Sequence, residues 1–561
     1  MDNYAIAENF SLLSKLMDIH GENSFKTKTY SIAAFNIEKL PGPLKDTPGE
    51  KIFSIKGIGN SVGKKIIEML ETGQLGVLEK YIDSTPPGIV EMLNIKGLGP
   101  KKIHTIWKEM EIESIGELQY ACNENRLTLY KGFGEKTQKN VLDAIEFYQQ
   151  NQGHFLYAQV DAVFSQVQAY LEKIFSPSIV HVTGAFRRQE LTIEELEFVI
   201  LETNEVIKPK FQTAQPPELL EETGNTLLYK LKNGLKLRLY TGKDFLDEKL
   251  FLTTGPEEFV SSFKKSFPSV KFGNKKAKND EPVFEQAKIR YIPPGMRWTP
   301  GIIEKTKSKG IADFVTPGDI KSIIHSHSNW SDGVNTIEEM ATALIQKGYE
   351  YLVISDHSKS AVYANGLSEE RIKEQHRYID ELNDKLSPFR IFKSIECDIL
   401  NDGSMDYPDK ILATFDLVIA SIHSNLKMTE DKAMMRLLKA ISNPYVTILG
   451  HMTGRLLLSR NGYPVDTEKI IDACAKNQVA IELNAHPRRL DMDWKFIGYA
   501  IEKGVLISID PDAHAIEGFD DVKYGVLSAQ KAGLTKEHNL SSFNLNRFEN
   551  YLAERKKKKG I

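Results

Sequence analysis

The pattern of apolar and polar positions changes twice along the chain. In residues 1–150 apolar side chains recur at helical spacing, as in IAENFSLLSKLMDI and IIEMLETG, with breaks at PGPL and TPPG. Residues 151–300 join one long helical stretch to short runs that predict strands, namely IVHVTGAF, LEFVIL, YKLKNGLKLRLY and VKFG. We therefore predict an all-α domain at 1–150, an α+β domain at 151–300 and a linker at 301–320.

Residues 321–561 follow a third pattern, in which short apolar runs alternate with helical segments. Seven runs fit parallel strands: KSIIH, YLVIS, FKSIE, LVIAS, TILGH, VAIEL and VLISI. Strict alternation of strand and helix is typical of a parallel sheet, and seven repeats predict a closed or nearly closed barrel. The final residues, ERKKKKGI, predict a solvated tail, with contact to nucleic acid as the alternative.

The all-α region repeats one short pattern three times. IKGIG at 55–59, IKGLG at 95–99 and YKGFG at 130–134 each precede a helical stretch that carries lysines. In a Gly-hydrophobe-Gly turn the missing Cβ atoms let backbone amides at the next helix start face a phosphate. A plain helix–helix turn is the alternative, but three copies favour a helix-hairpin-helix that binds DNA without sequence preference. The candidate DNA-binding residues are Gly57, Gly59, Lys64, Lys65, Gly97, Gly99, Lys101, Gly132 and Gly134.

Composition limits the class of protein. The 561 residues carry 72 Lys+Arg against 76 Asp+Glu, a net charge of -4, so no global positive field attracts nucleic acid and any phosphate site must be local. Three cysteines exclude a disulfide framework and a Cys-based zinc finger, and they suit a reducing compartment. With no signal peptide and no apolar run of membrane-spanning length, we expect a cytoplasmic protein without a membrane partner.

Histidines and carboxylates gather at the ends of the predicted barrel strands. Six of the 13 histidines follow such strands, together with at least three acids. In α/β barrels these strand ends converge on one mouth. Without a metal, so many imidazoles would repel one another on protonation and leave polar atoms unpaired. Imidazole and carboxylate without thiolate suit zinc, manganese or iron, and a cluster of two or three ions serves hydrolysis of phosphoesters.

The barrel motifs HSHSNWSDG, ISDHS, IECDILNDGSMDYPD, SIHS, GHMTGRLL and PDAH resemble the polymerase-and-histidinol-phosphatase (PHP) domain. With the upstream repeats, the whole chain resembles the bacterial family X DNA polymerases. The resemblance implies a helical, lyase-like DNA-binding domain, an α+β nucleotidyltransferase-like palm and a distorted (β/α)7 PHP barrel. It also implies nine metal ligands: His325, His327, Asp332, His357, Glu396, His423, His451, Asp512 and His514.

Two further barrel residues are candidates for catalytic roles. Asp356 is expected to orient His357 from behind the metal site. Arg455, in GHMTGRLL, either holds a substrate phosphate or pairs with a barrel carboxylate.

The resemblance breaks in the central domain. There the family pattern resembles Gly-Ser-Tyr-Arg-Arg, then Asp-hydrophobe-Asp on one strand and a third Asp on a later strand. This chain has Ala185 for the serine, aligns Glu195 and Glu197 with the first two aspartates, and has Lys236 at the third position. Mg²⁺ tolerates little distortion, and a lysine puts a cation where a metal would sit. We therefore predict a degenerate polymerase site; more simply, the two glutamates are solvated acids of an alternating strand.

The resemblance implies a DNA repair enzyme that hydrolyses DNA phosphodiesters as a 3′-5′ exonuclease. The expected partner is gapped or 3′-recessed duplex DNA, the expected cofactors are two or three Mn²⁺ or Zn²⁺ ions with iron as a further choice, and we expect a monomer. An active gap-filling polymerase and a non-catalytic DNA-binding scaffold with structural metals are the alternatives. A small-molecule phosphatase is disfavoured because it has no use for the Gly-turn repeats. Lys65 lies near the family's lyase nucleophile, but contact with a phosphate is the simpler role.

Overall fold

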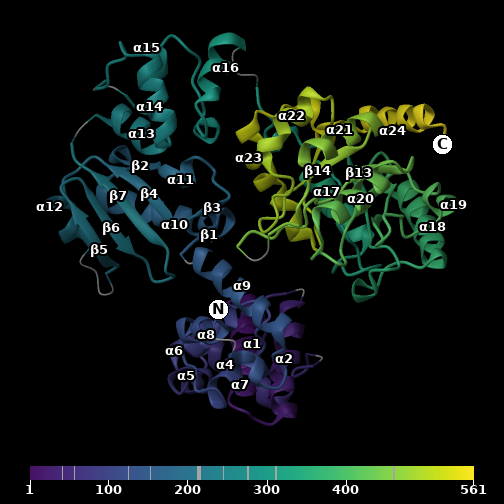
Figure 1. The fold of residues 1–561 in the computed structure, drawn as a ribbon, viewed down its shortest axis with the longest axis horizontal. Coiled ribbons are helices and arrows are strands. Elements are labelled where there is room, and N and C mark those ends of the chain that lie inside the picture. Colours follow the sequence, from purple (N-terminus) through teal and green to yellow (C-terminus); the bar gives the residue numbers. More distant parts are fainter. Residues whose placement is uncertain are drawn as a thin grey trace. The chain divides into compact units, whose positions relative to one another are not determined.

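The computed structural model describes residues 1–40, 42–55, 57–123, 126–151, 153–211, 216–243, 245–274, 277–309, 313–458 and 461–561. The chain forms two compact units, Met1–Gln152 and Gly153–Ile561 (Figure 1). Within the described ranges, no helix is both long and apolar enough to cross a membrane. The predicted fold classes are confirmed: the first unit is helical, and the second combines a mixed sheet with an α/β barrel. The residue boundaries between domains stay predictions.

The first unit consists of short helices around one apolar core. Its α-helices are α1 (Asn3–Ile19), α2 (Ser24–Glu38), α3 (Gly49–Ile52), α4 (Asn60–Thr72), α5 (Gly76–Asp83), α6 (Pro87–Glu91), α7 (Pro100–Lys108), α8 (Ile115–Asn123) and α9 (Glu135–Asn151). Helix α1 begins where the Asp2 side chain accepts a hydrogen bond from the Ala5 amide, and it buries Phe10 and Leu13 in the core. The glycine repeats therefore join helices whose apolar side chains are buried together in one core.

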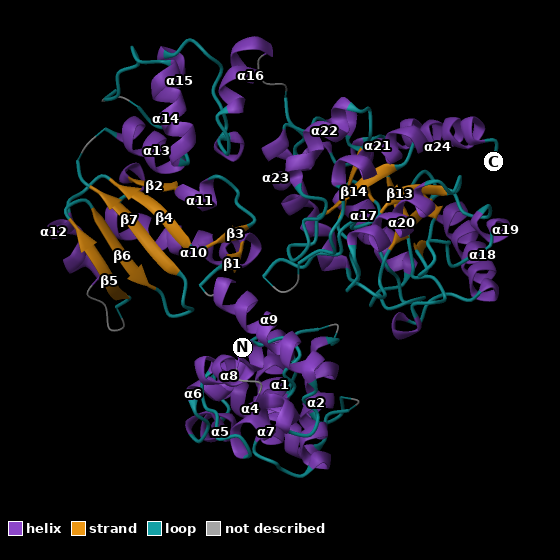
Figure 2. Ribbon diagram, viewed as in Figure 1, coloured by secondary structure: helices purple, strands orange, loops and turns teal. Residues whose placement is uncertain are grey.

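The second unit begins with a mixed sheet covered by helices (Figure 2). Its elements are β1 (Phe155–Leu156), α10 (Tyr157–Phe175), β2 (Val180–Thr183), α11 (Gly184–Arg187), β3 (Thr192–Ile193), β4 (Glu195–Ile200), α12 (Asn204–Ile207), β5 (Glu218–Thr223), β6 (Thr226–Lys230), β7 (Lys236–Thr241), α13 (Leu246–Thr254), α14 (Glu257–Ser266), α15 (Glu281–Gln286) and α16 (Gly301–Lys309). The strand order is β2-β4-β7-β6-β5, with β4 and β7 parallel. Helix α16 lies in the predicted linker, of which residues 310–312 lie outside the described residues.

The predicted strand VKFG is wrong. The Lys271 amide donates to the Gln286 side chain, and the Gly273 and Asn274 amides donate to the Asp247 carboxylate. Gly273 also has a φ of 108°, outside the extended region. Side chains from distant helices thus take the backbone donors that a neighbouring strand would need.

The barrel contains eight parallel strands in its described part. Its strands and α-helices are β8 (Ser322–Ile323), α17 (Ile337–Lys347), β9 (Tyr351–Ile354), α18 (Glu369–Leu386), β10 (Arg390–Lys393), β11 (Glu396–Asp398), α19 (Asp409–Leu412), β12 (Val418–Ser421), α20 (Glu430–Ile441), β13 (Val446–Leu449), α21 (Thr467–Asn477), β14 (Ala480–Asn484), α22 (Ile497–Glu502), β15 (Ile507–Asp510), α23 (Val522–Ala532) and α24 (Leu545–Lys559). They form two sheets, β10-β9-β8 and β11-β12-β13-β14-β15. The run FKSIE, predicted as one strand, is split between them. Single bridges, Ser326 to Ala513 and His357 to Glu396, join the sheets into a ring.

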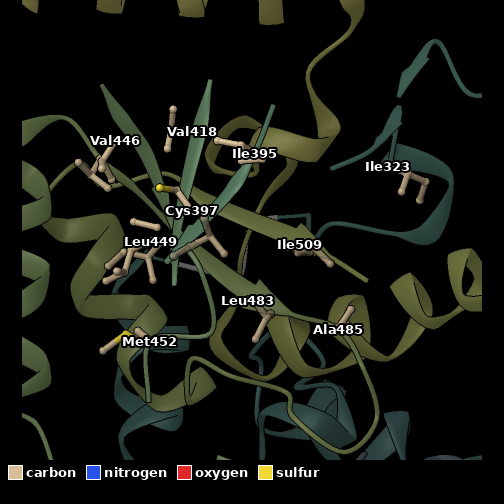
Figure 3. Close-up of a cluster of buried hydrophobic side chains, with 14 of the residues drawn as sticks. Ile323, Ile395, Cys397, Val418, Val446, Leu449, Met452, Leu483, Ala485 and Ile509 are labelled. Atoms are coloured by element: carbon tan, nitrogen blue, oxygen red, sulfur yellow. The ribbon is translucent and has the colours of Figure 1, made fainter. Parts of the chain in front are cut away.

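Apolar side chains fill both faces of the barrel wall. An outer cluster, which includes Cys397, Val418 and Leu483, packs under the surrounding helices (Figure 3). An inner cluster includes Ile419 and Ile448, so the lower barrel is filled by side chains.

Helix α24 completes the inner cluster with Phe548 and Leu552. The prediction of a solvated C-terminal tail is therefore wrong for part of that segment. Arg555 is buried and donates to the carbonyls of Gln478 and Val446, and Lys556 Nζ donates to the Phe415 carbonyl. These cations satisfy carbonyls at the lower rim of the barrel.

A buried ion-pair cluster joins the mixed sheet to its following helices. Asp280 is fully buried and pairs with Arg297 and Arg187, whose Nη2 lies 2.7 Å from Asp280 Oδ1. Burial alone would raise the pKa of Asp280, but the two guanidinium groups outweigh it and hold the pKa well below its usual range. Because the folded-state pKa is depressed, this stabilisation is present above the ordinary carboxyl pKa of ~3.9 and is lost as the pH falls below it.

We expect Asp280→Asn to lower the free energy of unfolding by about 3–5 kcal/mol, because Arg297 would remain buried without its counter-charge. Urea unfolding at pH 7 measures the change. Asp313→Asn is the matched control, since Asp313 pairs with Arg290 at the surface and is 99% exposed; its cost should stay within about 1 kcal/mol. Equal costs for the two variants would contradict the assignment.

Candidate metal centre

The nine predicted ligands all lie at the upper ends of barrel strands. His325 and His327 follow β8, and Asp332 lies in the next turn. His357 follows β9, Glu396 opens β11, and His423 and His451 follow β12 and β13. The pair Asp512 and His514 follows β15.

Glu396 is the centre of this group. Its Oε1 lies 3.2 Å from His325 Nε2, 3.1 Å from His423 Nε2 and 2.9 Å from His451 Nε2. Its Oε2 lies 2.9 Å from His357 Nδ1 and 3.6 Å from His327 Nε2. Five imidazoles from four strand ends therefore surround one carboxylate that is 1% exposed.

Three sets of donor atoms are close enough for a metal ion each. They are His327, Asp332, His357 and His514; His325, His327 and Asp512; and His357, Glu396 and His423. Within each set the donor atoms lie within 4.8 Å of one another, and neighbouring sets share His327 or His357. These donor sets overlap, so the mouth offers neighbouring positions that could hold divalent ions.

Unpaired buried atoms show that these residues fit metal ions. Among the described residues, His325 Nε2, His327 Nδ1 and Glu396 Oε2 are buried and form no hydrogen bond. Buried polar atoms normally find a partner, so atoms aimed at one another without bonding indicate a common cation. The donors are imidazole nitrogens and carboxylate oxygens, a set that suits divalent zinc, manganese or iron.

The protonation pattern supports the same conclusion. Burial alone would lower the pKa of His423, but Glu396 and Asp398 outweigh it and raise the pKa to about 10. Burial and the nearby His514 and His357 lower the pKa of His327 to about 3. Protons on some imidazoles balance the carboxylates, and a bound divalent cation would supply that charge and release them.

A second ring of polar residues holds the ligands in place. Glu482 accepts a hydrogen bond from the His451 amide and contacts His325 Nδ1, and Asp398 Oδ1 lies 2.9 Å from His423 Nδ1. Such carboxylate partners set the orientation of metal-binding imidazoles. Glu482 and Asp398 stand at strand ends in the sequence, but the pattern assigns them no role.

Arg489 is a site residue that the sequence analysis missed. Its Nε lies 3.5 Å from Asp512 Oδ2, which brings a guanidinium to the mouth. The only sequence signal is its place in the loop HPRR after the sixth predicted strand.

Asp356 contacts the turn that carries Asp332. It is fully buried and accepts hydrogen bonds from Ser328, Ser331 and Gln375. Its carboxylate therefore holds that turn in place, and the orientation of His357 by Asp356 stays a prediction.

Arg455 meets the second of its two predicted roles. It donates to the Arg489 and Leu490 carbonyls and pairs with Asp493 Oδ2 at 3.2 Å, so it supports the loop after β14.

The three residues predicted to form a degenerate polymerase site share one face of the mixed sheet, where internal partners balance their charges. Strands β4 and β7 pair Glu195 with Lys236 and Glu197 with Arg238. Arg238 binds Glu195 through two nitrogens, one of them at 3.0 Å. The cation that binds Glu195 is therefore Arg238, whereas the Nζ of Lys236, the register partner of Glu195, pairs with Glu194 at 2.9 Å.

Glu197 closes the turn that precedes α11. Its carboxylate accepts hydrogen bonds from the Ala185 amide at 2.7 Å and from the Tyr240 hydroxyl at 3.0 Å. Gly184 has a φ of 65°, and a Cβ there would meet Glu197 Oε2 at 1.6 Å. The glycine is thus required to let this internal carboxylate reach the turn.

The three glycine turns share one backbone geometry. Gly57, Gly97 and Gly132 have φ values of 88°, 87° and 92°, which favour glycine. The second glycines lie immediately before helices: Gly59 before α4, Gly99 before α7 and Gly134 before α9.

The lysines near these turns differ in their surroundings. Lys64 and Lys101 are exposed in the first turns of α4 and α7. Lys65 is half-buried, and its Nζ lies 5.8 Å from the ring centre of Tyr30. The two exposed lysines are thus available beside the helix starts.

Family models match three parts of the chain. A helix-hairpin-helix domain model matches residues 1–75, a SAM-like helix-hairpin-helix tandem model matches residues 89–146, and a PHP domain model matches residues 324–486. The fold, the mouth and these matches define a helix-hairpin-helix protein with a PHP domain, which is a metal-dependent hydrolase domain.

Curated relatives extend the match to the whole chain. A protein of Bacillus subtilis (strain 168) named DNA polymerase/3′-5′ exonuclease PolX is 32% identical over 557 residues, 96% of each chain. Probable phosphatases of Thermoanaerobacter sp. (strain X514) and Caldanaerobacter subterraneus subsp. tengcongensis are 28% and 27% identical over 42% of this chain, covering 96% and 92% of their own lengths. The chain therefore belongs to the bacterial family X DNA polymerases, the PolX family.

We expect His325→Ala/His327→Ala to remove bound metal from protein purified with Mn²⁺ present, because these residues serve two donor sets. Elemental analysis after gel filtration should find about two to three ions per wild-type chain and fewer in the variant. Glu195→Ala/Glu197→Ala is the control and should retain the full content. Full retention by the histidine variant would exclude these ligands.

Proposed function

We propose that this chain is a DNA repair enzyme whose PHP mouth hydrolyses DNA phosphodiesters from the 3′ end. The three overlapping donor sets around Glu396 carry the proposal. All nine residues implied by the family resemblance are proposed as ligands. Two or three Mn²⁺ or Zn²⁺ ions, with iron as a further choice, fit this nitrogen and oxygen set.

The reaction is hydrolysis of the terminal phosphodiester. Divalent ions held by these donor sets would lower the pKa of a bound water and hold phosphoryl oxygens. Water adds to phosphorus and the P–O3′ bond breaks, so the strand keeps a 3′-hydroxyl and a 5′-nucleotide leaves. The chain orients these groups: the Glu396 carboxylate lies beside the histidines of neighbouring donor sets, and Arg489 offers a guanidinium for a phosphate at the rim.

The substrate side of the mouth is inferred from exposure. His514 and Asp332 have side chains that are 42% and 32% exposed, whereas Glu396 is buried. A purely structural metal site is normally closed by protein ligands. The half-open donor set therefore favours catalysis over the alternative of a scaffold with structural metals.

The polymerase site is proposed to be inactive. A gap-filling polymerase would need Glu195 and Glu197 to bind metal, but Arg238 and the Ala185 amide engage these carboxylates. Opening them would break charge-assisted hydrogen bonds, which are the stronger kind.

The partner is proposed to be gapped or 3′-recessed duplex DNA, bound by the chain as a monomer. Three turns of one geometry, each before a helix start, suit successive backbone phosphates and read no bases. The cytoplasm is the proposed location, because Cys122, Cys397 and Cys474 are buried thiols, as in proteins of reducing compartments.

We expect Lys64→Ala/Lys101→Ala to weaken duplex binding by a similar factor for unrelated sequences. The slope of log affinity against log salt should fall in magnitude by about 2, because each phosphate contact contributes ~0.9. Fluorescence anisotropy between 50 and 200 mM salt measures both quantities. Lys15→Ala/Lys45→Ala removes two exposed lysines outside the turns and should change the slope less. An equal change would contradict the proposed contacts.

We expect the wild type with Mn²⁺ to shorten a 5′-labelled primer recessed on its template, with or without dNTPs. Glu195→Ala/Glu197→Ala should retain this shortening, and His325→Ala/His327→Ala should abolish it. Gel analysis of the labelled strand distinguishes the outcomes. Lengthening with dNTPs that is lost in the glutamate variant would restore the polymerase interpretation.

A further inference from the structure

A pocket of about 380 Å³ opens beside the metal mouth and is lined by Asn329, Trp330, Thr336, Arg371 and Tyr378. We propose that it binds the base of the nucleotide being removed, with the indole of Trp330 as the stacking surface. This inference rests on the proposed exonuclease function. It adds a subsite for the nucleoside, apart from the ligands that act on the phosphate.

The position of Trp330 links the pocket to the metal centre. Trp330 lies between His327 and Asp332, both of which belong to one donor set. Two residues of chain span at most ~7 Å between Cα atoms, so the indole begins within that distance of Asp332. In a nucleotide, a single sugar joins the base to its 5′-phosphate. The short separation between Trp330 and Asp332 therefore allows the base to occupy the pocket while the phosphate lies at the metal centre.

The turn that carries Trp330 is rigid. The Ser331 and Gly333 amides both donate to the Ser328 carbonyl, at 3.1 and 2.9 Å. A Cβ on Gly333 would lie 2.1 Å from the His327 carbonyl oxygen, so the turn packs closely against the ligand strand. A rigid turn keeps the indole at a constant distance from the donor atoms.

Arg371, on α18, forms the opposite wall of the pocket and holds the backbone of Trp330 in place. Arg371 donates to the Trp330 carbonyl and to the Asn365 carbonyl at 2.8 Å, and Asn365 Nδ2 donates to the Trp330 carbonyl at 3.2 Å. Arg371 is therefore a positioning residue for the indole. Its charge also makes the wall favourable for a nucleotide phosphate.

The chemistry of the lining suits a base. Trp330 is half-buried, and its ring centre lies 6.3 Å from that of Tyr378. An aromatic face binds any base by stacking, because every base has a π surface. Asn329 and Thr336 add polar groups at the edge, and aromatic walls with few polar groups are typical of small-ligand pockets. The subsite is thus expected to tolerate all four bases.

Two diesters with the same leaving group test the subsite. The p-nitrophenyl ester of thymidine 5′-monophosphate carries a base, and methyl p-nitrophenyl phosphate does not. With Mn²⁺-loaded enzyme, Trp330→Ala should lower kcat/KM for the thymidine ester roughly 5- to 150-fold, mainly through KM, as expected for loss of one stacked base. The methyl ester should change less than about twofold, because it never uses the pocket.

Two further variants serve as controls. Trp330→Phe keeps an aromatic face and should recover most of the thymidine-ester activity. Tyr349→Ala removes a half-buried aromatic just before β9, at the lower end of the barrel, and should affect both esters equally. An equal loss on both esters with Trp330→Ala would mean that the indole only supports the metal turn, which overturns the subsite. No loss on either ester overturns it as well.

Equilibrium binding separates this proposal from the exonuclease function. Calorimetry with Mn²⁺-loaded protein should find tighter binding of thymidine 5′-monophosphate than of deoxyribose 5-phosphate, and Trp330→Ala should remove the difference. If the wild type hydrolyses neither ester but keeps this preference, the hydrolytic function fails and the base subsite stands. If the wild type hydrolyses both esters but binds the two phosphates equally, the subsite fails and the function stands.

Discussion

The buried carboxylate of Glu396 is the constraint on which the barrel mouth depends. A carboxylate removed from water costs several kcal/mol unless cations and hydrogen bonds offset that cost. Here five imidazoles surround it, and they come from the ends of β8, β9, β12 and β13. The barrel must close for these strands to meet, so closing the fold and assembling the site are one event. The bridge from His357 to Glu396 is at once a joint between the two sheets and a contact inside the site.

The same constraint explains the layers inside the barrel. The lower interior is apolar and is completed by Phe548 and Leu552 of α24. The upper interior is polar, and Glu482 supports His325 and His451 from beneath. The donors most exposed at the mouth are Asp332 and His514, and Asp332 lies two residues from Trp330 of the proposed base pocket.

The mixed sheet keeps its fold without a metal because its own cations satisfy its acids. The turn between α11 and β3 also contacts the barrel. Lys531 Nζ donates to the Arg188 carbonyl at 3.0 Å and lies 3.3 Å from Glu190 Oε2. Tyr157 and Leu191 of this domain face Pro487 and Leu490 across a small cavity. Those two barrel residues flank Arg489, so the domain of the mixed sheet packs against the loop that brings a guanidinium to the mouth.

Sequence reasoning indicated which side chains lie together where their position on a strand decides it. The candidate histidines were grouped correctly because the strand ends of an α/β barrel meet at one face whatever the loops do. Sequence reasoning did not predict which hydrogen-bond or ion-pair partner a side chain has when several lie at similar distances. The sequence did not indicate that Asp356 binds the turn of Ser328, or that Arg238, rather than the register partner Lys236, forms the ion pair with Glu195. Such choices depend on rotamers and on loops that approach from elsewhere in the chain, which strand periodicity does not encode.

The sequence by itself determined the fold classes, the three glycine turns and the collection of histidines and carboxylates at the barrel strand ends. Each of these follows from local spacing or from residue identity. Only the tertiary structure decided that one carboxylate, Glu396, is shared by five histidines, that Glu197 closes the turn at Gly184, and that Trp330 lines a pocket beside the mouth. These facts join residues that are distant in sequence or depend on a side chain's direction, and only packing of the whole chain sets those.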